Sequence, residues 1–275
     1  MRRVLRLLVF LVVAMAALKL LVWWLEPKMA FFPFKGIQET PASVGVAFAD
    51  LRIPTSDGET LHAWWFESAS PRAQIVYWHG NGGNLSLWMP VLVDLYKRGF
   101  SVLAVDYRGY GDSTGKPSEQ GIYRDGEAAV EYFNSKLARK NVPTIFWGRS
   151  LGCSVASYTA TRHAPSGMVL ESPFPDVAFL FTNNPVMRVL SVFSSYQFAT
   201  ARYLEQYSGP LLVVHGDADS IIPFAAGKRV FERAATPKKY FAVLPGANHN
   251  DVYASHPDYA AIIDRFLFTI PSARQ

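Results

Sequence analysis

Gly148-Arg149-Ser150-Leu151-Gly152 is the stretch of sequence on which the prediction of the fold rests. The apolar run Ile145–Trp147 before it predicts a buried strand, and the pattern that starts at Leu151 predicts a helix. A Gly-x-Ser-x-Gly motif between a strand and a helix is typical of a nucleophile elbow, whose glycines permit a strained turn that exposes the serine hydroxyl. The sequence therefore predicts Ser150 as a nucleophile. The N–H of Leu151, at the start of the helix, is predicted to stabilise an oxyanion.

Short apolar runs alternate with helical patterns along the rest of the chain. The predicted strands are Val46–Ile53, Leu61–Phe66, Ile75–Trp78, Val102–Val105, Ile145–Trp147, Met168–Leu170, Leu211–His215 and Tyr240–Leu244. The predicted helices are Leu87–Arg98, Gly121–Arg139, Leu151–His163, Ala225–Ala235 and Tyr259–Leu267. The first two strands flank Ser56-Asp57-Gly58, which favours a hairpin, and the others are typical of buried parallel strands. This alternation predicts an α/β domain over residues 46–275, with a mostly parallel sheet covered by helices on both faces.

An acid and a base are expected after the elbow, in loops that follow later strands. The loop Gly246-Ala247-Asn248-His249 supplies His249 as the general base. The loop after Leu211–His215 contains two carboxylates, and we predict that Asp219 orients His249 while Asp217 braces the turn. Asp217 is the alternative acid, and Glu171, just after Met168–Leu170, is a more remote one.

A second oxyanion donor is expected from the glycine-rich loop His79-Gly80-Asn81-Gly82-Gly83-Asn84. Its glycines allow the backbone to approach a ligand, and we assign the Asn81 N–H as the donor. A turn without a ligand is the alternative interpretation, whereas a phosphate loop is excluded because no Gly-Lys-Ser/Thr follows. The charged pair Asp106 and Arg108 in the next loop is interpreted as a structural brace.

Residues 173–209 interrupt the alternation of strands and helices. The segment is rich in aromatic and apolar side chains and exceeds the length of an ordinary connection. It predicts a small cap of short helices over the site. Most of its aromatic side chains are expected to pack the cap onto the sheet, and a few are candidates for lining an acyl pocket.

Residues 1–26 are predicted to be a transmembrane helix, and residues 27–45 a linker. Val4–Leu25 is almost wholly apolar and has about the ~20 residues that a membrane-spanning helix needs. Three arginines, Arg2, Arg3 and Arg6, lie at its start, so the positive-inside rule places the N-terminus in the cytoplasm and the main domain across the membrane, in the periplasm of a bacterium. A signal peptide cleaved at Ala14-Met15-Ala16 is the alternative. The apolar stretch continues well beyond that point, which favours an uncleaved anchor.

Composition excludes several classes of protein. Half of the residues are hydrophobic, which is enough for a sizeable core and argues against disorder. The net charge of +5 is not clustered outside the N-terminus, so the sequence predicts no nucleic-acid partner and favours contact with anionic lipid. Because Cys153 is the one cysteine, an internal disulfide and a thiolate metal cage are excluded. The site residues imply no metal and no organic cofactor.

The glycine-rich loop, the Asp106–Gly111 loop, the elbow, His215-Gly216-Asp217-Ala218-Asp219 and the His249 loop occur together and in order. Over residues 46–268 the chain resembles the Bem46-like branch of the α/β-hydrolases, which includes YfhR-like membrane-anchored hydrolases and the ABHD17-like depalmitoylases. The resemblance implies an eight-stranded sheet and a triad of Ser150, Asp219 and His249. The depalmitoylases attach to membranes through an N-terminal cysteine cluster, which this chain lacks.

Together these features predict a membrane-anchored serine hydrolase that cleaves a carboxylic ester or thioester. The anchor and the aromatic cap favour a lipid-like acyl group. A serine peptidase or amidase with the same triad is the first alternative. The second is a membrane-tethered binding protein without catalytic activity, which an intact set of site residues disfavours.

Overall fold

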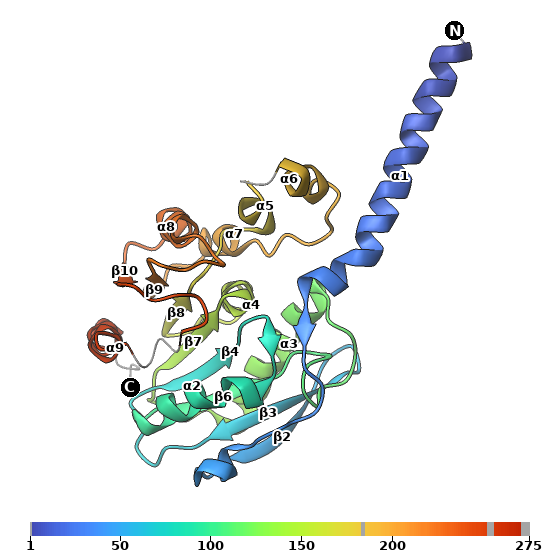
Figure 1. Ribbon diagram of the computed structural model, residues 1–275. Coiled ribbons are helices and arrows are strands. Elements are labelled where there is room, and N and C mark those ends of the chain that lie inside the picture. Colours follow the sequence, from blue (N-terminus) through green and yellow to red (C-terminus); the bar gives the residue numbers. More distant parts are fainter. Residues whose placement is uncertain (1, 183–184, 252–255, 271–275) are drawn as a thin grey trace.

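The computed structural model describes residues 2–182, 185–251 and 256–270. One eight-stranded sheet forms its centre, in the order β10-β9-β8-β7-β4-β6-β3-β2 (Figure 1). The strands are β2 (Ala49–Pro54), β3 (Thr60–Phe66), β4 (Gln74–Trp78), β6 (Ser101–Val105), β7 (Thr144–Arg149), β8 (Gly167–Glu171), β9 (Leu211–Gly216) and β10 (Lys239–Leu244). Strand β3 runs antiparallel to both β2 and β6, and the other neighbours are parallel. The predicted fold class, an α/β sheet that is mostly parallel, is confirmed.

Helices cover both faces of the sheet because its strands carry apolar side chains on both sides. Helices α2 (Leu85–Lys97) and α9 (Tyr259–Leu267) contribute to one buried cluster, with Leu92 and Ile263 among its members. The cluster on the other face includes α3 (Glu119–Tyr132), α4 (Leu151–Ala160) and α8 (Phe224–Arg233). A π-helical turn, η2 (Phe133–Leu137), extends α3. The sheet is therefore a rigid platform whose strand ends position loops.

In its described residues, 173–182 and 185–209, the segment between β8 and β9 contains three short helices. They are α5 (Val177–Leu180), α6 (Pro185–Ser191) and α7 (Thr200–Leu204). Buried aromatic side chains, Phe174 and Phe198, join this segment to the core. These helices form the layer that we call the cap.

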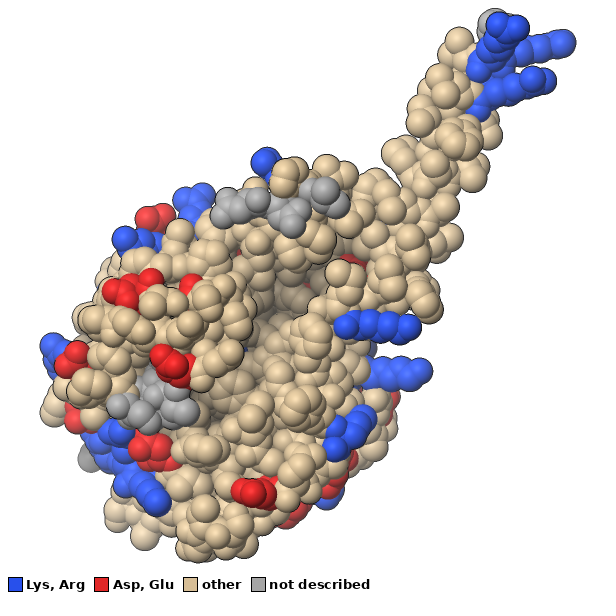
Figure 2. Space-filling view, in the orientation of Figure 1, with Lys and Arg blue, Asp and Glu red and all other residues tan. Residues whose placement is uncertain are grey.

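The N-terminal helix α1 (Arg2–Ala30) extends away from the domain (Figure 1). Its length and composition are sufficient to cross a membrane, and no residue of its most apolar window is buried. Figure 2 shows basic side chains gathered at its far tip. The helix does not end at Pro27, as the sequence suggested, because the Phe31 N–H donates to the Pro27 carbonyl and closes one more turn.

The stretch 27–45, predicted as a linker, is largely part of the domain. It contains β1 (Phe32–Pro33) and the 3-10 helix η1 (Pro41–Val44). Strand β1 pairs in parallel with β5 (Gly82–Gly83), which lies in the glycine-rich loop after β4. Phe31 is buried against Tyr196 and Phe198 of the cap, with ring centroids 5.6 and 6.0 Å apart. The chain that leaves α1 therefore enters the core at once.

Candidate active site

Ser150 lies at the turn between β7 and α4. Its φ of 51° and ψ of −113° fall in a region that non-glycine residues rarely occupy. A hydrogen bond of 2.8 Å from the Ser150 N–H to the Glu171 carbonyl fixes this turn against β8. A Cβ atom on Gly148 would overlap with the Gly152 carbonyl, and one on Gly152 would overlap with the Trp78 carbonyl. Both glycines are therefore needed for the close approach of the turn, the helix and β4.

His249 and Asp219 meet in the loops that follow β10 and β9. The His249 Nδ1 lies 2.8 Å from the Asp219 Oδ2. The other carboxylate oxygen, Oδ1, accepts from the N–H groups of Ile221 and Ile222 at 3.0 and 2.8 Å, and the Ser172 hydroxyl donates to Oδ2 at 2.8 Å. These bonds fix the buried carboxylate, whereas the His249 side chain is 11% exposed.

The environment of Asp219 favours its ionised form. Burial of the carboxyl group opposes ionisation, but hydrogen bonds from His215 and His249 outweigh burial, and they hold the pKa of Asp219 well below its usual range. A carboxylate that stays ionised can stabilise a positive charge on the neighbouring imidazole.

The two other carboxylates considered as the acid have different partners. Asp217 accepts a hydrogen bond of 2.6 Å from the Gly246 N–H and so braces the turn before His249. Glu171 is buried, forms an ion pair with Arg149 at 3.2 Å and accepts a hydrogen bond from the Tyr259 hydroxyl. Neither is bonded to His249.

Arg149 links the elbow to the histidine loop, a contact that sequence reasoning missed. Its Nη2 donates to the carbonyls of His249 and Asp251 at 2.6 and 2.7 Å, while its Nη1 faces Glu171. The guanidinium also lies over the Trp88 ring. The variable second position of the elbow motif gave no signal for this role. Arg149, which directly precedes Ser150, thus connects the elbow with the loop that carries His249.

The glycine-rich loop is held from two sides. The Tyr110 hydroxyl lies 2.9 Å from the Asn81 carbonyl oxygen and 2.8 Å from its side-chain oxygen. The Asn81 Nδ2 donates to the Ala30 carbonyl at 2.7 Å, at the end of α1. Leu151 is the first residue of α4. The first N–H groups of a helix have no acceptor within that helix. The end of α1 thus braces the loop that carries Asn81.

Asp106 and Arg108 brace the loops with separate partners rather than with each other. Asp106 is fully buried, lies between His62 and His79 at 3.4 and 3.3 Å, and accepts a hydrogen bond from the Leu85 N–H at 3.0 Å. Arg108 pairs with Asp57 and Asp125, both at 2.8 Å.

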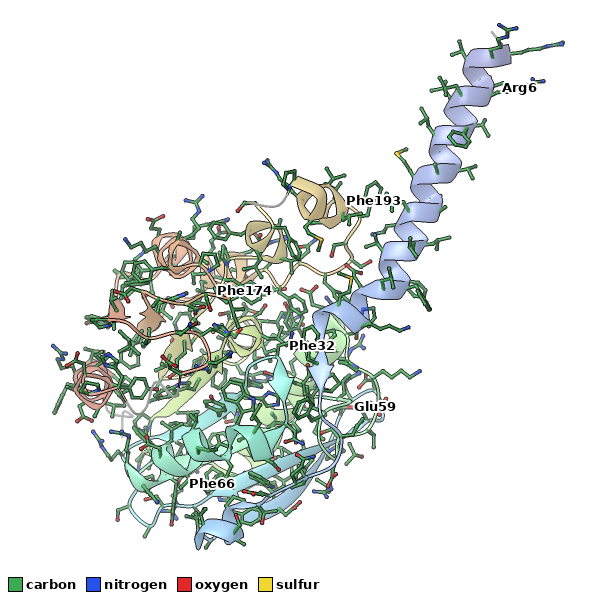
Figure 3. The ribbon with its side chains drawn as sticks, viewed as in Figure 1. Arg6, Phe32, Glu59, Phe66, Phe174 and Phe193 are labelled. Carbon is green, nitrogen blue, oxygen red and sulfur yellow. The ribbon has the colours of Figure 1, made fainter. Side chains whose placement is uncertain are left out.

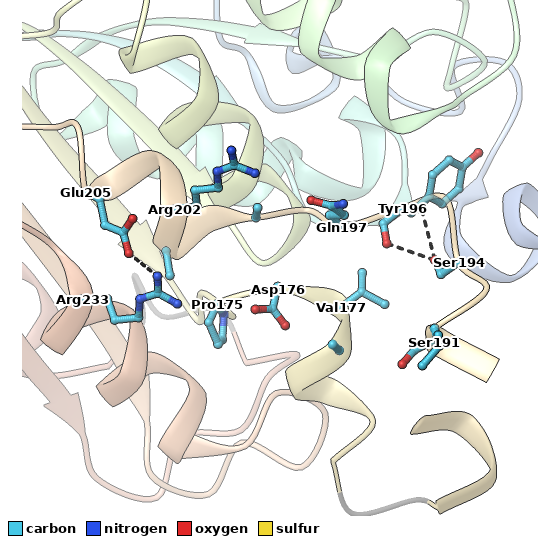
Figure 4. Close-up of a pocket in the computed structure, with 14 residues that line it drawn as sticks. Pro175, Asp176, Val177, Ser191, Ser194, Tyr196, Gln197, Arg202, Glu205 and Arg233 are labelled. Carbon is cyan, nitrogen blue, oxygen red and sulfur yellow. Dashed lines mark hydrogen bonds and ion pairs between the residues drawn. The ribbon is translucent and has the colours of Figure 1, made fainter. Parts of the chain in front are cut away.

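A cavity of about 590 Å³ lies within the cap (Figure 4). Its lining mixes apolar side chains such as Val177 with polar ones, and Arg233 in its wall pairs with Glu205. Tyr196 is the aromatic side chain that lines it. Within the described part of the chain, this lining does not include Ser150, Asp219 or His249. The cavity is therefore separate from the acid–base pair.

An elbow serine followed by an acid and a base, on a mostly parallel sheet of eight strands, defines the class as α/β-hydrolase. Comparison with known proteins agrees. Residues 69–203 match the family described as serine aminopeptidase, S33. An uncharacterized protein of Mycobacterium tuberculosis is 33% identical over 236 residues, which cover 84% of this chain and 82% of that protein. The lysophosphatidylserine lipase ABHD12 of Mus musculus is 30% identical over 270 residues, which cover 86% of this chain and 67% of that protein.

Solved structures show the same fold. An esterase of Pyrococcus furiosus matches with a TM-score of 0.73 at 21% identity, covering 88% of this chain and 99% of that one. An esterase of a Rhodococcus species matches with a TM-score of 0.61 at 19% identity, covering 81% and 99%. The chain belongs to the α/β-hydrolase superfamily, has an ABHD-like domain and is a hydrolase.

Proposed function

We propose that this protein is a membrane-anchored serine hydrolase that cleaves a carboxylic ester or thioester with a lipid-like acyl group. The observation that carries the proposal is the hydrogen bond of 2.8 Å between His249 and Asp219, in loops that follow the elbow of Ser150 in the order this class requires. The ABHD12 relative, named as a lipase for a lysophospholipid, supports a lipid substrate.

In the proposed reaction the Ser150 hydroxyl attacks the acyl carbon, and His249 takes its proton at Nε2. Asp219 holds the other ring nitrogen and stabilises the imidazolium. The amides of Asn81 and Leu151 bind the oxyanion. When the tetrahedral intermediate collapses, His249 returns the proton to the leaving alcohol or thiol, and an acyl-enzyme remains. Water, activated by the same histidine, then releases the carboxylic acid and restores the serine.

Helix α1 is the proposed membrane anchor. Arg2, Arg3 and Arg6 lie at its far end, so the positive-inside rule favours a cytoplasmic N-terminus and a catalytic domain on the other side. No residue of the most apolar window of α1 is buried, which supports this role over that of a core helix.

Labelling with a fluorophosphonate probe tests the nucleophile. The full-length protein should be labelled, and Ser150→Ala should abolish labelling and lower turnover of p-nitrophenyl esters by about 10⁶-fold. Ser157→Ala, a change of a buried serine on α4, the helix that follows Ser150, is the matched control and should retain labelling. Full turnover in Ser150→Ala would refute the assignment.

A serine peptidase or amidase is the second candidate, because the matching family is described as a serine aminopeptidase. The wild-type protein should be offered lysophospholipids, acyl thioesters and aminoacyl amides side by side. A preference for the amides in kcat/KM would replace the proposed ester substrate while leaving the role of Ser150 intact.

A further inference from the structure

The cap touches α1 inside its apolar stretch rather than beyond it. The Lys19 Nζ donates to the Phe193 carbonyl at 2.6 Å. About two turns further along, the Glu26 carboxylate accepts from the N–H groups of Ser195 and Tyr196 at 2.6 and 3.2 Å. The residues 193–196, which we call the cap loop, therefore bind two charged side chains of this half of the helix, Lys19 and Glu26. In Figure 3, Phe193 lies beside α1, far from Arg6 at the other end.

The partial burial of three side chains of α1 shows the same contact between the helix and the cap. Leu18, Val22 and Leu25 are half-buried, while most of the helix before them is exposed. Their spacing places them on one face of a helix. Leu18 lies seven residues before Leu25, the last residue of the apolar stretch. At ~1.5 Å per residue, the cap thus extends roughly 10 Å along that stretch.

This overlap determines the depth of the cap if α1 crosses a bilayer. Elements that lie in a membrane interface bury their apolar side about 5–10 Å into the boundary between headgroups and acyl chains. The part of the cap beside Leu18 and Val22 would occupy the same depth. A membrane around α1 has no room for lipid headgroups where the cap already stands, so the cap must displace them.

The surface of the cap carries exposed apolar and basic side chains, which suit a location in the membrane interface. Val189 and Val192, one helical turn apart in α6 and just after it, are 61% and 79% exposed. The exposed Arg188 stands next to them and can reach lipid phosphates. The space-filling view shows a neutral surface that continues from α1 onto the adjoining cap (Figure 2). Exposed apolar side chains beside a membrane helix fit a lipid partner.

We propose that α6 and the cap loop lie in the membrane interface, with Val189 and Val192 inserted at the acyl boundary. This inference rests on the membrane anchor of the proposed function and adds that the catalytic domain is docked to the bilayer by a second element. The hydrolase is then held with its cap against the lipid surface, where an ester lipid is removed from the bilayer.

Fluorescence quenching in liposomes of phosphatidylcholine and phosphatidylglycerol tests the proposal on the full-length protein. Val192→Cys is labelled with a polarity-sensitive dye, and Cys153 does not compete because it is buried. Phe268→Cys is the matched control, since Phe268 is an apolar residue that is 90% exposed and directly follows α9, away from α1. Doxyl-labelled lipids should quench the dye at position 192 at least about threefold more than at position 268. Equal quenching at the two positions would overturn the proposal.

Three further measurements separate the possible failures. Alkaline carbonate extraction of the same samples reports on the anchor alone, so a retained protein with an unquenched dye refutes the docked cap but not the anchor. The dye could instead be shielded from water in a way that depends on protein concentration and not on doxyl lipid. That result would show that a second copy of the protein covers this face, and it would also overturn the proposal.

The variant Val189→Asp/Val192→Asp should hydrolyse a bilayer ester at least about tenfold more slowly, with unchanged turnover of a soluble p-nitrophenyl ester. An equal loss on both substrates would contradict the docked cap.

Discussion

Replacing Arg149 by methionine should reduce both the stability and the activity of this hydrolase. The side chains of Arg149 and Glu171 are only 3% and 1% exposed, and their ion pair is 3.2 Å long. Removal of one partner of a buried pair leaves the other charge uncompensated, which lowers the free energy of unfolding by about 3–5 kcal/mol. For a domain of this size, the midpoint of thermal unfolding should fall by roughly 6–20 °C.

The effect on activity follows from different atoms of the same side chain. Two carbonyls of the histidine loop accept hydrogen bonds from the Arg149 Nη2, and hydrogen bonds to a charged group contribute about 1.5–3 kcal/mol. If the loss of this tether moves His249 away from its reactive position, kcat/KM should fall about ten- to a hundredfold. Activity is measured with p-nitrophenyl esters well below the unfolding temperature, and stability by urea titration in detergent.

A double variant separates the two roles of Arg149. Arg149→Met/Glu171→Gln removes both charges and leaves an amide oxygen as acceptor for the Tyr259 hydroxyl, so most of the lost stability should return. Activity should not return, because the tether to His249 is still missing. Recovery of kcat/KM together with stability would refute the positioning role. Arg72→Met is the control, since its ion pair with Asp264 is exposed and should contribute at most about 1 kcal/mol.

Three other outcomes follow from the same geometry. Asp219→Asn should lower kcat about 10⁴-fold in the ester assay, and it should also remove part of the acid dependence of stability. The folded pKa of Asp219 is depressed, so its contribution to stability is present above the ordinary carboxyl pKa and is lost as the pH falls below it, which urea titrations from about pH 6 to pH 3 would detect. Gly152→Ala should lower the free energy of unfolding by about 1–3 kcal/mol, because the added Cβ atom meets the Trp78 carbonyl. Gly82→Ala is the control: a Cβ atom there meets no atom within 4 Å, so thermal unfolding should be nearly unchanged. Deletion of residues 1–26 should preserve turnover of a soluble ester. Deletion of residues 1–36 should reduce that turnover strongly, because the longer deletion removes Phe31 and the pairing of β1 with β5. Equal activity of the two truncated proteins would contradict the role of residues 27–36.

The sequence was sufficient for those parts of the fold that short-range patterns encode. The predicted helix Tyr259–Leu267 coincides with α9, and the predicted strand Ile145–Trp147 lies within β7. These elements could be predicted because a buried strand or an amphipathic helix repeats the same apolar spacing along its own length. The order of motifs likewise anticipated that His249 and Asp219 would lie together, and they are hydrogen bonded.

Other features depend on partners that are distant along the chain. Arg149 occupies a position of the elbow motif that tolerates many residues, and its carbonyl partners lie about a hundred residues later. Strand β1 is two residues long, too short for a periodic signal, and only its pairing with β5 makes it a strand. Lys19 and Glu26 have partners about 170 residues later in the chain, and only the fold places the cap loop beside them.

Three of the connections that the sequence could not reveal join the N-terminal segment to the rest of the domain. Ala30 accepts from the side chain of Asn81, Phe31 packs on the cap, and Glu26 binds the cap loop. A helix that only tethered the domain would need none of these contacts, because a flexible linker is enough to hold a soluble enzyme near a membrane. Here a change in the tilt of α1 would pull directly on the loop of the proposed oxyanion donor and on the cap. In the proposed membrane-anchored form, the same few residues therefore connect the orientation of the enzyme to the geometry of its candidate active site.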